Sequence, residues 1–145
     1  MNDTGIPLPQ AGLRHSEHLV VRPLHTVPEI DDAWPGFRDM PPVFATAVMI
    51  GFVEQTCIEA LRPYLSAGQR TVGTHVDISH VAATPVGMTV TAEVELIACD
   101  GKRLRFRVRC SDEAGLIGEG THDRAIINFE TFWRRVLKKK EKFNV

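Results

Sequence analysis

Three side chains with useful chemistry lie in or after one strongly apolar segment: the hydroxyl of Thr46, the carboxylate of Glu54 and the imidazole of His80. Ten of the eleven residues from 43 to 53 are apolar or glycine, and Glu54 follows directly. Burying a carboxylate is costly unless a partner compensates it, so Glu54 is a candidate nucleophile or general base. The alternative is that Glu54 marks where a helix emerges into solvent.

Thr46 and Glu54 are eight positions apart in the predicted helix. At 100° and 1.5 Å per residue they lie about 80° around the axis and about 12 Å along it. Both can therefore border one cleft without touching each other. A helical threonine can instead bond the carbonyl one turn back, which would leave Thr46 without a role in chemistry.

His80 ends the strand expected over 71–80, where it shares the inward face with Val72, Val76 and Ile78. His75 belongs to the opposite face. Because strand ends open into clefts, an inward histidine at such an end is the better functional candidate. A structural histidine with satisfied hydrogen bonds fits the same pattern.

Several other classes of protein find no support. The six histidines and three cysteines have no metal-ligand spacing, and no serine-hydrolase, Walker A or dinucleotide-binding motif is present. We expect no metal and no cofactor. The formal net charge of −1 gives no electrostatic reason to expect nucleic acid or an anionic membrane as a partner.

The expected compartment is the cytoplasm. Cys57, Cys99 and Cys110 form no paired pattern, which is typical of a reducing environment. No basic segment followed by an apolar stretch marks a signal peptide. The longest apolar run, 43–53, is interrupted by polar residues or glycine and is too short to span a bilayer.

With 145 residues the chain predicts a single domain, with a loose leader over 1–12 and a C-terminal helix and tail over 129–145. Hydrophobic periodicity predicts strands over 13–24, 71–80, 88–98, 102–111 and 116–128, and helices over 43–61 and 129–142. Pro42 suits the first position of the long helix, and the last four strands should follow one another through short turns. A loop over 28–42 precedes this helix.

The long helix is apolar on every side over its first turns, which predicts burial all round. One antiparallel sheet wrapped around it cannot cover every side. We therefore expect a second copy to cover the rest, in a homodimer or a dimer of dimers.

The two middle strands alternate cleanly, with Leu96 and Leu104 among their inward residues. A three-residue turn over 99–101 would keep inward residues opposite each other, and would place Glu95 opposite Arg105. The arginine row at 103, 105, 107 and 109 then forms a solvated face of the sheet.

Several motifs resemble the fluoroacetyl-CoA thioesterase family, and the similarity runs from about residue 43 to 128 with the spacing between motifs preserved. They are Pro42-Val43-Phe44-Ala45-Thr46, Gly51-Phe52-Val53-Glu54, Val72-Gly73-Thr74-His75-Val76, Ser79-His80, Ala82-Ala83-Thr84-Pro85 and Gly120-Thr121-His122-Asp123-Arg124. The resemblance implies an α+β hotdog fold, in which one long buried helix is wrapped by an antiparallel sheet of about five strands and followed by a C-terminal helix.

The same resemblance implies a dimeric thioesterase that hydrolyses a short acyl-CoA, with CoA as part of the substrate. Thr46, Glu54 and His80 fall on the catalytic triad. The carboxylate would attack the thioester carbonyl or activate a water, the histidine would manage a proton, and the hydroxyl would orient the carboxylate. Gly73 and Arg124 would border the thioester or the CoA moiety.

One departure from the family concerns the loop before the helix, whose aromatic residues form a lid over the acyl pocket. Phe37 matches one lid residue, whereas Met40 stands where the family pattern has phenylalanine. Because methionine is flexible, Met40 predicts a looser pocket and broader acyl selectivity. Two alternatives remain on this scaffold: an enzyme similar to enoyl-CoA hydratase, and a non-catalytic dimer that binds acyl-CoA or another small ligand.

Overall fold

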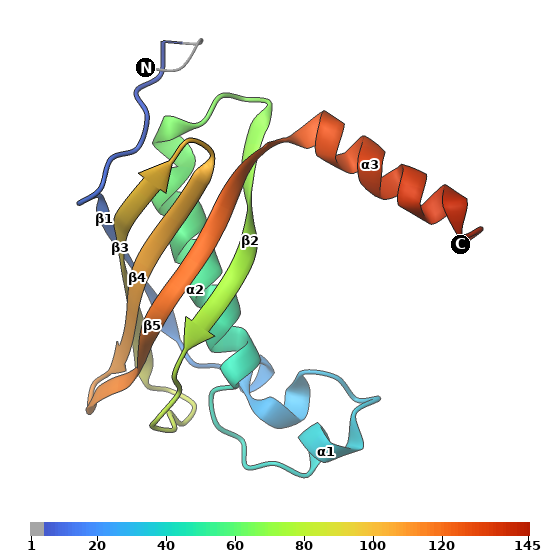
Figure 1. Ribbon diagram of the computed structural model, residues 1–145. Coiled ribbons are helices and arrows are strands. Elements are labelled where there is room, and N and C mark those ends of the chain that lie inside the picture. The colour runs from blue at the N-terminus through green and yellow to red at the C-terminus, as the bar shows by residue number, and fades with distance from the viewer. Residues whose placement is uncertain (1–4) are drawn as a thin grey trace.

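The computed structural model describes residues 5–145 and places one antiparallel sheet around one long helix (Figure 1). The strands are β1 (Arg14–Val20), β2 (Gln69–Ile78), β3 (Thr89–Asp100), β4 (Arg103–Asp112) and β5 (Gly115–Asn128), in the order β1-β3-β4-β5-β2. The helices are α1 (Pro35–Arg38), α2 (Thr46–Leu61) and α3 (Phe129–Lys142), with short 3-10 turns at Pro23–His25, Val27–Glu29 and Arg62–Tyr64. The predicted hotdog architecture, with its C-terminal helix, is confirmed.

The core lies between α2 and the inner face of the sheet. The inward residues of β3 and β4 are at most 3% exposed, as their alternation predicts: Val90, Ala92, Val94, Leu96, Leu104, Phe106, Val108 and Cys110. They join a cluster with Met49, Val53, Cys57 and Leu61 of α2. Burying a side chain such as leucine or phenylalanine contributes about 1.5–3 kcal/mol, so this cluster fixes how α2 lies on the sheet.

The predicted register of the β3–β4 hairpin is wrong by two residues. Asp100 pairs with Arg103 across a tight turn in which Gly101 has φ +60°, and Glu95 lies opposite Arg107 rather than Arg105. A bulge between Leu96 and Ala98 adds the residue that restores the alternation. A bulge and a longer turn both keep the inward residues of the two strands opposite each other, so sequence periodicity does not distinguish them.

Helix α2 begins at Thr46, three residues later than predicted, and Pro42 is not its first residue. The preceding residues are extended because their backbone groups pair elsewhere: the Phe44 amide donates to the Thr84 carbonyl (2.8 Å) and the Ala45 amide to the His25 carbonyl (3.0 Å). These bonds hold the entry to the helix, so Thr46 stands in its first turn.

One side of α2 remains exposed in this chain, as expected if a single sheet cannot cover every side of the helix. The exposed residues on this side are Thr46, Ala47, Gly51 and Gln55. Strand β2 forms an edge of the sheet, and Val76, predicted to point inward, is 44% exposed there. Both features leave apolar surface that the single sheet does not cover.

The connection from β2 to β3 spans residues 79–88, so the prediction of short turns between all four strands is wrong here. After β2 ends, the chain still follows β5: the Ser79 amide donates to the Glu119 carbonyl (2.9 Å) and the Val81 amide to the Ile117 carbonyl (2.7 Å). Gly118 permits this approach, because a Cβ there would collide with the Ser79 carbonyl. The backbone on both sides of His80 is thereby fixed.

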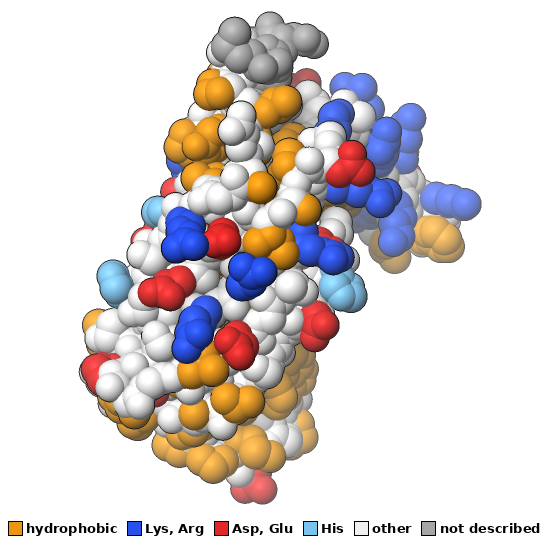
Figure 2. Space-filling view, turned by 60° about the vertical axis from the view of Figure 1, so that its left-hand side comes forward, with side chains coloured by type: hydrophobic (Ala, Val, Ile, Leu, Met, Phe, Trp, Pro, Cys, Tyr) orange, Lys and Arg blue, Asp and Glu red, His pale blue; other side chains and the backbone are white. Residues whose placement is uncertain are grey.

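The outer face of the sheet is charged, as the arginine row predicts. Arg105 pairs with Asp123 (2.8 Å), and Glu95 forms ion pairs with both Arg14 (3.0 Å) and Arg107 (3.6 Å). Figure 2 shows positive and negative side chains interspersed on this surface. Such exposed pairs contribute little to stability, and the face is a solvated one in this protomer.

Helix α3 has the predicted bounds and projects away from the body of the molecule (Figure 1). Asn128 caps it by accepting a hydrogen bond from the Thr131 amide (3.0 Å). Its apolar residues are 37–50% exposed: Phe129, Phe132, Trp133, Val136 and Leu137. The remaining positions are mostly basic, which makes α3 strongly amphipathic.

The predicted leader lies partly outside the described residues, which begin at 5. Residues 5–12 form no helix or strand, and the Gly12 amide donates to the Leu96 carbonyl (2.8 Å), where the chain joins the sheet. Within residues 5–145, none of the helices has both the length and the apolar character that a membrane span requires.

Candidate active site

Thr46 and His80 meet at the start of α2. Thr46 Oγ1 lies 2.8 Å from His80 Nδ1, and the two residues are 34 positions apart in the chain. The entry of α2 places the hydroxyl, and the pairing of residues 79 and 81 with β5 places the imidazole. Within one protomer the hydroxyl therefore orients the imidazole, and not the carboxylate as expected.

The environment of His80 favours its neutral form. Burial lowers the pKa of His80 below its usual 6.5, so the ring carries no charge at pH 7. The ring of Phe44 packs edge-on against it, with 6.5 Å between centroids. His80 Nε2 is buried and has no hydrogen-bond partner within residues 5–145.

An apolar cavity of about 530 Å³ adjoins Thr46, and Phe37 and Met40 both line it. A smaller hollow of about 300 Å³ on the other side of Thr46 reaches His80. Trp34 packs edge-on against Phe37 at 5.0 Å and supports the lid residue from outside. Met40 is 49% exposed, so the lid in this protomer is open at that position. The predicted lid residues thus lie beside the Thr46–His80 pair.

Glu54 occupies a second cluster, farther along the same helix. Its Oε1 accepts a hydrogen bond from Arg124 Nη1 at 3.1 Å. The side chain of Glu54 is 39% exposed, whereas that of Arg124 is only 3% exposed. A buried guanidinium thus holds a carboxylate that solvent and a ligand can reach. Arg124 therefore borders the Glu54 carboxylate directly.

Gly73 lies directly behind this carboxylate. A Cβ at Gly73 would stand 2.5 Å from Glu54 Oε1 and 3.2 Å from His122 Cε1. Any larger residue would displace Glu54 from Arg124. The structure therefore explains why a glycine is needed here, at the bulge between Gly73 and His75 where β2 changes register against β5.

His122 also belongs to the Glu54 cluster and had no assigned role in the sequence-based hypothesis. Its side chain is fully buried, and its Nε2 lies 3.1 Å from Arg124 Nη1 and 3.9 Å from Glu54 Oε1. The only sequence signal was its position two residues before Arg124 on the same strand. Side chains two apart on a strand share one face, so this proximity could have been inferred.

The two buried cysteines, Cys57 and Cys110, supply no competing nucleophile. Burial raises the pKa of Cys57 to about 12 and that of Cys110 to about 11, so neither gives a thiolate near neutral pH. Within residues 5–145, no group of three or more His, Cys, Asp or Glu side chains is arranged to hold a metal ion. His80 lines a hollow, and the Glu54 side chain is 39% exposed, so both remain candidates for the reacting groups.

The sheet-wrapped helix, a reactive carboxylate in its middle and a threonine–histidine pair beside an apolar cavity define a hotdog-fold thioesterase, a hydrolase of acyl-CoA. The model of the family described as fluoroacetyl-CoA-specific thioesterase matches residues 27–130. The chain belongs to this family.

Individual relatives agree. The fluoroacetyl-CoA thioesterase of Streptantibioticus cattleyicolor is 42% identical over 130 residues, which cover 90% of this chain and 94% of that protein. A solved structure of fluoroacetyl-CoA thioesterase superposes with a TM-score of 0.88 at 41% identity, covering 90% of this chain and 97% of the other. A thioesterase superfamily member from Thermus thermophilus gives 0.82 at 27% identity, with coverage of 95% and 97%.

The relatives also separate the alternatives left open by the sequence. The curated relative and the solved structures at 40–42% identity all carry thioesterase names. Thioester hydrolysis is therefore favoured over hydration of an enoyl-CoA and over binding without turnover.

Proposed function

We propose that the protein hydrolyses short-chain acyl-CoA thioesters to the free acid and CoA, with Glu54, His80 and Thr46 as the reacting and orienting groups. The observation that carries the proposal is the apolar cavity lined by Thr46, the hydrogen-bond partner of His80, which is large enough to hold a short acyl group. Glu54 supplies the carboxylate that the chemistry needs.

The reaction begins with Glu54, whose carboxylate accepts a charge-assisted hydrogen bond from Arg124. The carboxylate either attacks the thioester carbonyl carbon, giving a mixed anhydride and releasing the CoA thiolate, or removes a proton from a water that attacks instead. In the first route, water then cleaves the anhydride and restores the carboxylate. Both routes consume one water and yield acid and thiol.

His80 acts as a neutral imidazole. In the anhydride route, Nε2 takes a proton from the water that cleaves the anhydride and passes it to the released thiolate. In the direct-water route, Glu54 removes that proton and His80 positions the water. Thr46 fixes the ring through Nδ1. No step calls for a cofactor, and CoA enters as part of the substrate.

A homodimer completes this site. Within residues 5–145 of one protomer, no hydrogen bond or ion pair joins Glu54 to Thr46 or His80, and Glu54 lies two turns along α2 from Thr46. The exposed side of α2 and the edge strand β2 support a second copy there. In such a dimer the carboxylate of one protomer faces the Thr46–His80 pair of its partner.

The decisive test of the activity is release of free thiol from a panel of acyl-CoAs. Acetyl-, propionyl- and fluoroacetyl-CoA should all be hydrolysed, with kcat/KM values within about 10²-fold of each other, because Met40 leaves the pocket loose and a methylene changes binding by only about 1–3 kcal/mol. Absence of thiol release from the whole panel would refute the proposal. A preference of about 10⁴-fold for the fluorinated substrate would refute the loose pocket alone, and Met40→Phe should narrow selectivity.

The shared site is tested by mixing two inactive variants, Glu54→Gln and His80→Ala, under conditions that exchange protomers. If the site is shared, a mixed dimer contains one intact site, and the mixture should recover about a quarter of wild-type activity, since half of randomly formed dimers are mixed. If each site lies within one protomer, no activity returns. Free CoA thiol from acetyl-CoA is the measurement in both cases.

A further inference from the structure

The hydrogen bonds around His122 form a continuous chain that ends at Glu54. His122 Nδ1 lies 2.8 Å from the carbonyl oxygen of His75 on β2. A carbonyl oxygen only accepts hydrogen bonds, so Nδ1 must carry the proton. Nε2 of a neutral ring then has a lone pair, and it accepts from Arg124 Nη1 at 3.1 Å. The tautomer of His122 is thus set by its two partners.

Arg124 Nη1 carries two hydrogens, and each has a separate acceptor. One is directed to His122 Nε2 and the other to Glu54 Oε1, both at 3.1 Å. The rest of the guanidinium is anchored on β2, where Nε donates to Thr71 Oγ1 (2.9 Å) and Nη2 to the Thr71 carbonyl (2.8 Å). His122 and Thr71 together fix the plane of the guanidinium, and that plane fixes the carboxylate.

We infer that His122 is a positioning residue for Glu54, acting through Arg124, and that it does so as a neutral hydrogen-bond acceptor. The inference rests on the proposed function, because it gives Glu54 its reactive position. His122 is fully buried and cannot touch substrate, so it is not itself catalytic. A protonated ring would turn Nε2 into a donor facing an N–H group of Arg124, and the bond would be lost.

The surroundings keep His122 neutral. Burial lowers its pKa from 6.5, and the positive charge of Arg124 lowers it further, while the His75 carbonyl, Glu54 and Asp123 act in the opposite direction. The neutral ring therefore persists across the pH range in which a thioesterase would work. The acceptor for Arg124 is present throughout that range.

Two substitutions separate positioning from a merely structural role, because each keeps one of the two hydrogen bonds. His122→Gln places an amide oxygen near the position of Nε2 and retains an acceptor for Arg124. His122→Asn places an amide N–H near the position of Nδ1 and retains the bond to the His75 carbonyl, but it is too short to reach Arg124. We expect the Gln variant to keep kcat on acetyl-CoA within about threefold of wild type.

The Asn variant should lose kcat by about 10- to 100-fold with KM changed less than about threefold, because a misplaced carboxylate impairs chemistry more than binding. A structural role would give the reverse order, with Asn active and Gln impaired. Wild-type kcat in the Asn variant, or an equal loss in both variants, overturns the inference. Thermal melting of each variant accompanies the kinetics.

A measurement on the unaltered protein covers the case in which these variants fail to fold. The ¹⁵N shifts of the His122 side chain should show a ring that stays neutral, with its proton on Nδ1, from about pH 7 to 8. A proton on Nε2 of His122, or a charged ring at pH 7, overturns the inference. Glu54→Gln in the same thiol-release assay keeps the two proposals apart: wild-type turnover there defeats the proposed function, whereas loss there with an unimpaired His122→Asn defeats only the positioning role.

Discussion

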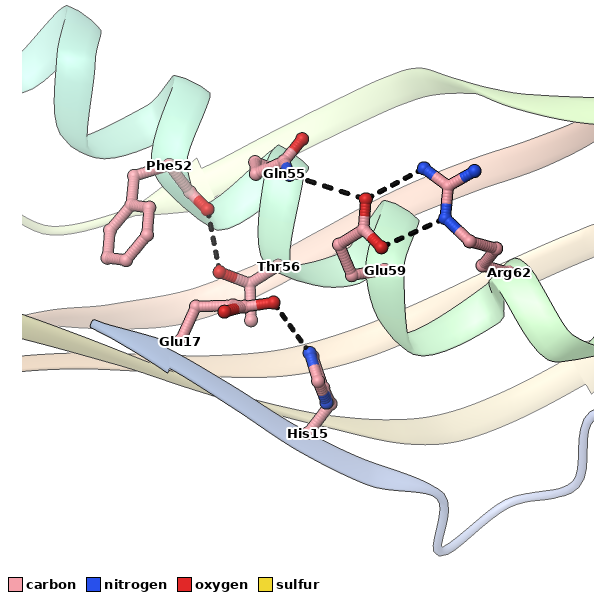
Figure 3. Close-up of polar contacts among 7 residues, drawn as sticks. All are labelled: His15, Glu17, Phe52, Gln55, Thr56, Glu59 and Arg62. Atoms are coloured by element: carbon pink, nitrogen blue, oxygen red, sulfur yellow. Dashed lines mark hydrogen bonds and ion pairs between the residues drawn. The ribbon is translucent and has the colours of Figure 1, made fainter. Parts of the chain in front are cut away.

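The two halves of α2 use the same residue types in opposite ways. Thr56 donates to the Phe52 carbonyl one turn back (2.8 Å), and Glu59 accepts from Arg62 (2.8 and 2.9 Å) and Gln55 (3.4 Å), all on the helix or directly after it (Figure 3). Thr46 and Glu54 instead bond residues 34 and 70 positions away. Hydrogen bonds between neighbouring residues stabilise the helix itself, whereas hydrogen bonds to distant residues position Thr46 and Glu54 in the candidate site.

Burial of the partner separates these pairs further. The Arg62 side chain is 68% exposed and the pair with Glu59 lies in solvent, where it contributes little. Arg124 is 3% exposed and pairs with Glu54 from the buried side, while the Glu54 side chain remains 39% exposed. An accessible carboxylate on a buried cation is the arrangement that distinguishes the reactive glutamate from the structural one.

The largest expected effect is the loss of activity in Glu54→Gln, for which Glu59→Gln is the matched control. The amide introduced by Glu54→Gln can still accept from Arg124 but provides neither a nucleophile nor a base, so kcat on acetyl-CoA should fall by roughly 10²-fold or more with the fold intact. Glu59→Gln should keep wild-type kcat. Steady-state thiol release and thermal melting check both, and a Glu54→Gln variant within threefold of wild type would contradict the assignment.

The next effect is on the pH profile. Because burial holds the pKa of His80 below 6.5, the neutral ring is complete above that pH and is lost as the pH falls through the lowered value. The rate constant kcat/KM should therefore be flat from about pH 7 to 8, with its acidic limb below 6.5. His80→Gln should remove this limb. A profile that rises with decreasing pH below 6.5 would show that the charged ring is the active form.

Thr46→Val should cause a smaller loss of activity, and Thr56→Val is its matched control. Removing the Thr46 hydroxyl leaves His80 Nδ1 without its protein partner, and one hydrogen bond of about 0.5–1.5 kcal/mol corresponds to about a threefold to tenfold loss of kcat. Thr56→Val removes only a bond to a carbonyl that the helix already uses, so activity should not change. Equal losses in the two variants would erase the distinction between the halves of α2.

The smallest effect concerns stability at low pH. The hydrogen bond from Arg62 holds the pKa of Glu59 below its usual 4.5, so the pair stabilises the fold above that pH and its contribution disappears as the pH falls through the lowered value. Glu59→Gln should flatten this part of the melting-temperature profile by at most a few degrees. A larger shift would mean that Glu59 supports more than its own turn of helix.

Much of the fold can be predicted from the sequence, and the same physical reason explains which parts cannot. Alternation and helical periodicity report which face a residue occupies, so the core of β3 and β4 and the bounds of α3 are predicted correctly. The bulge near Ile97 shifts the pairing by one residue, but only residues 98–100 of β3 follow it, too few for the alternation to reveal the shift. The extended entry at 43–45 depends on partners at His25 and Thr84, which no local pattern contains.

In the candidate site, too, the sequence identifies the residues but not the contacts between them. Glu54 is conspicuous because it interrupts an apolar run, and Thr46 and His80 are identified through the family motifs. The hydrogen bonds that give them roles are not local: Arg124 reaches Glu54 only because β5 pairs with β2 beneath α2. His122 lies within a family motif, and alternation places it on the same face as Arg124. Its hydrogen bond to the His75 carbonyl depends on the pairing of β5 with β2, which the sequence does not reveal.

The projecting helix α3 gives the molecule a large electric dipole that its net charge conceals. Among its 14 residues are six lysines or arginines and two glutamates, a surplus of four positive charges, so the rest of the chain carries a net charge of −5. A helix of this length extends about 21 Å, more than twice the Debye length of about 8 Å at physiological salt. The basic helix and the acidic body are therefore screened from each other. A polyanion such as CoA is attracted by α3 and repelled by the rest of the chain, although the protein as a whole is nearly neutral.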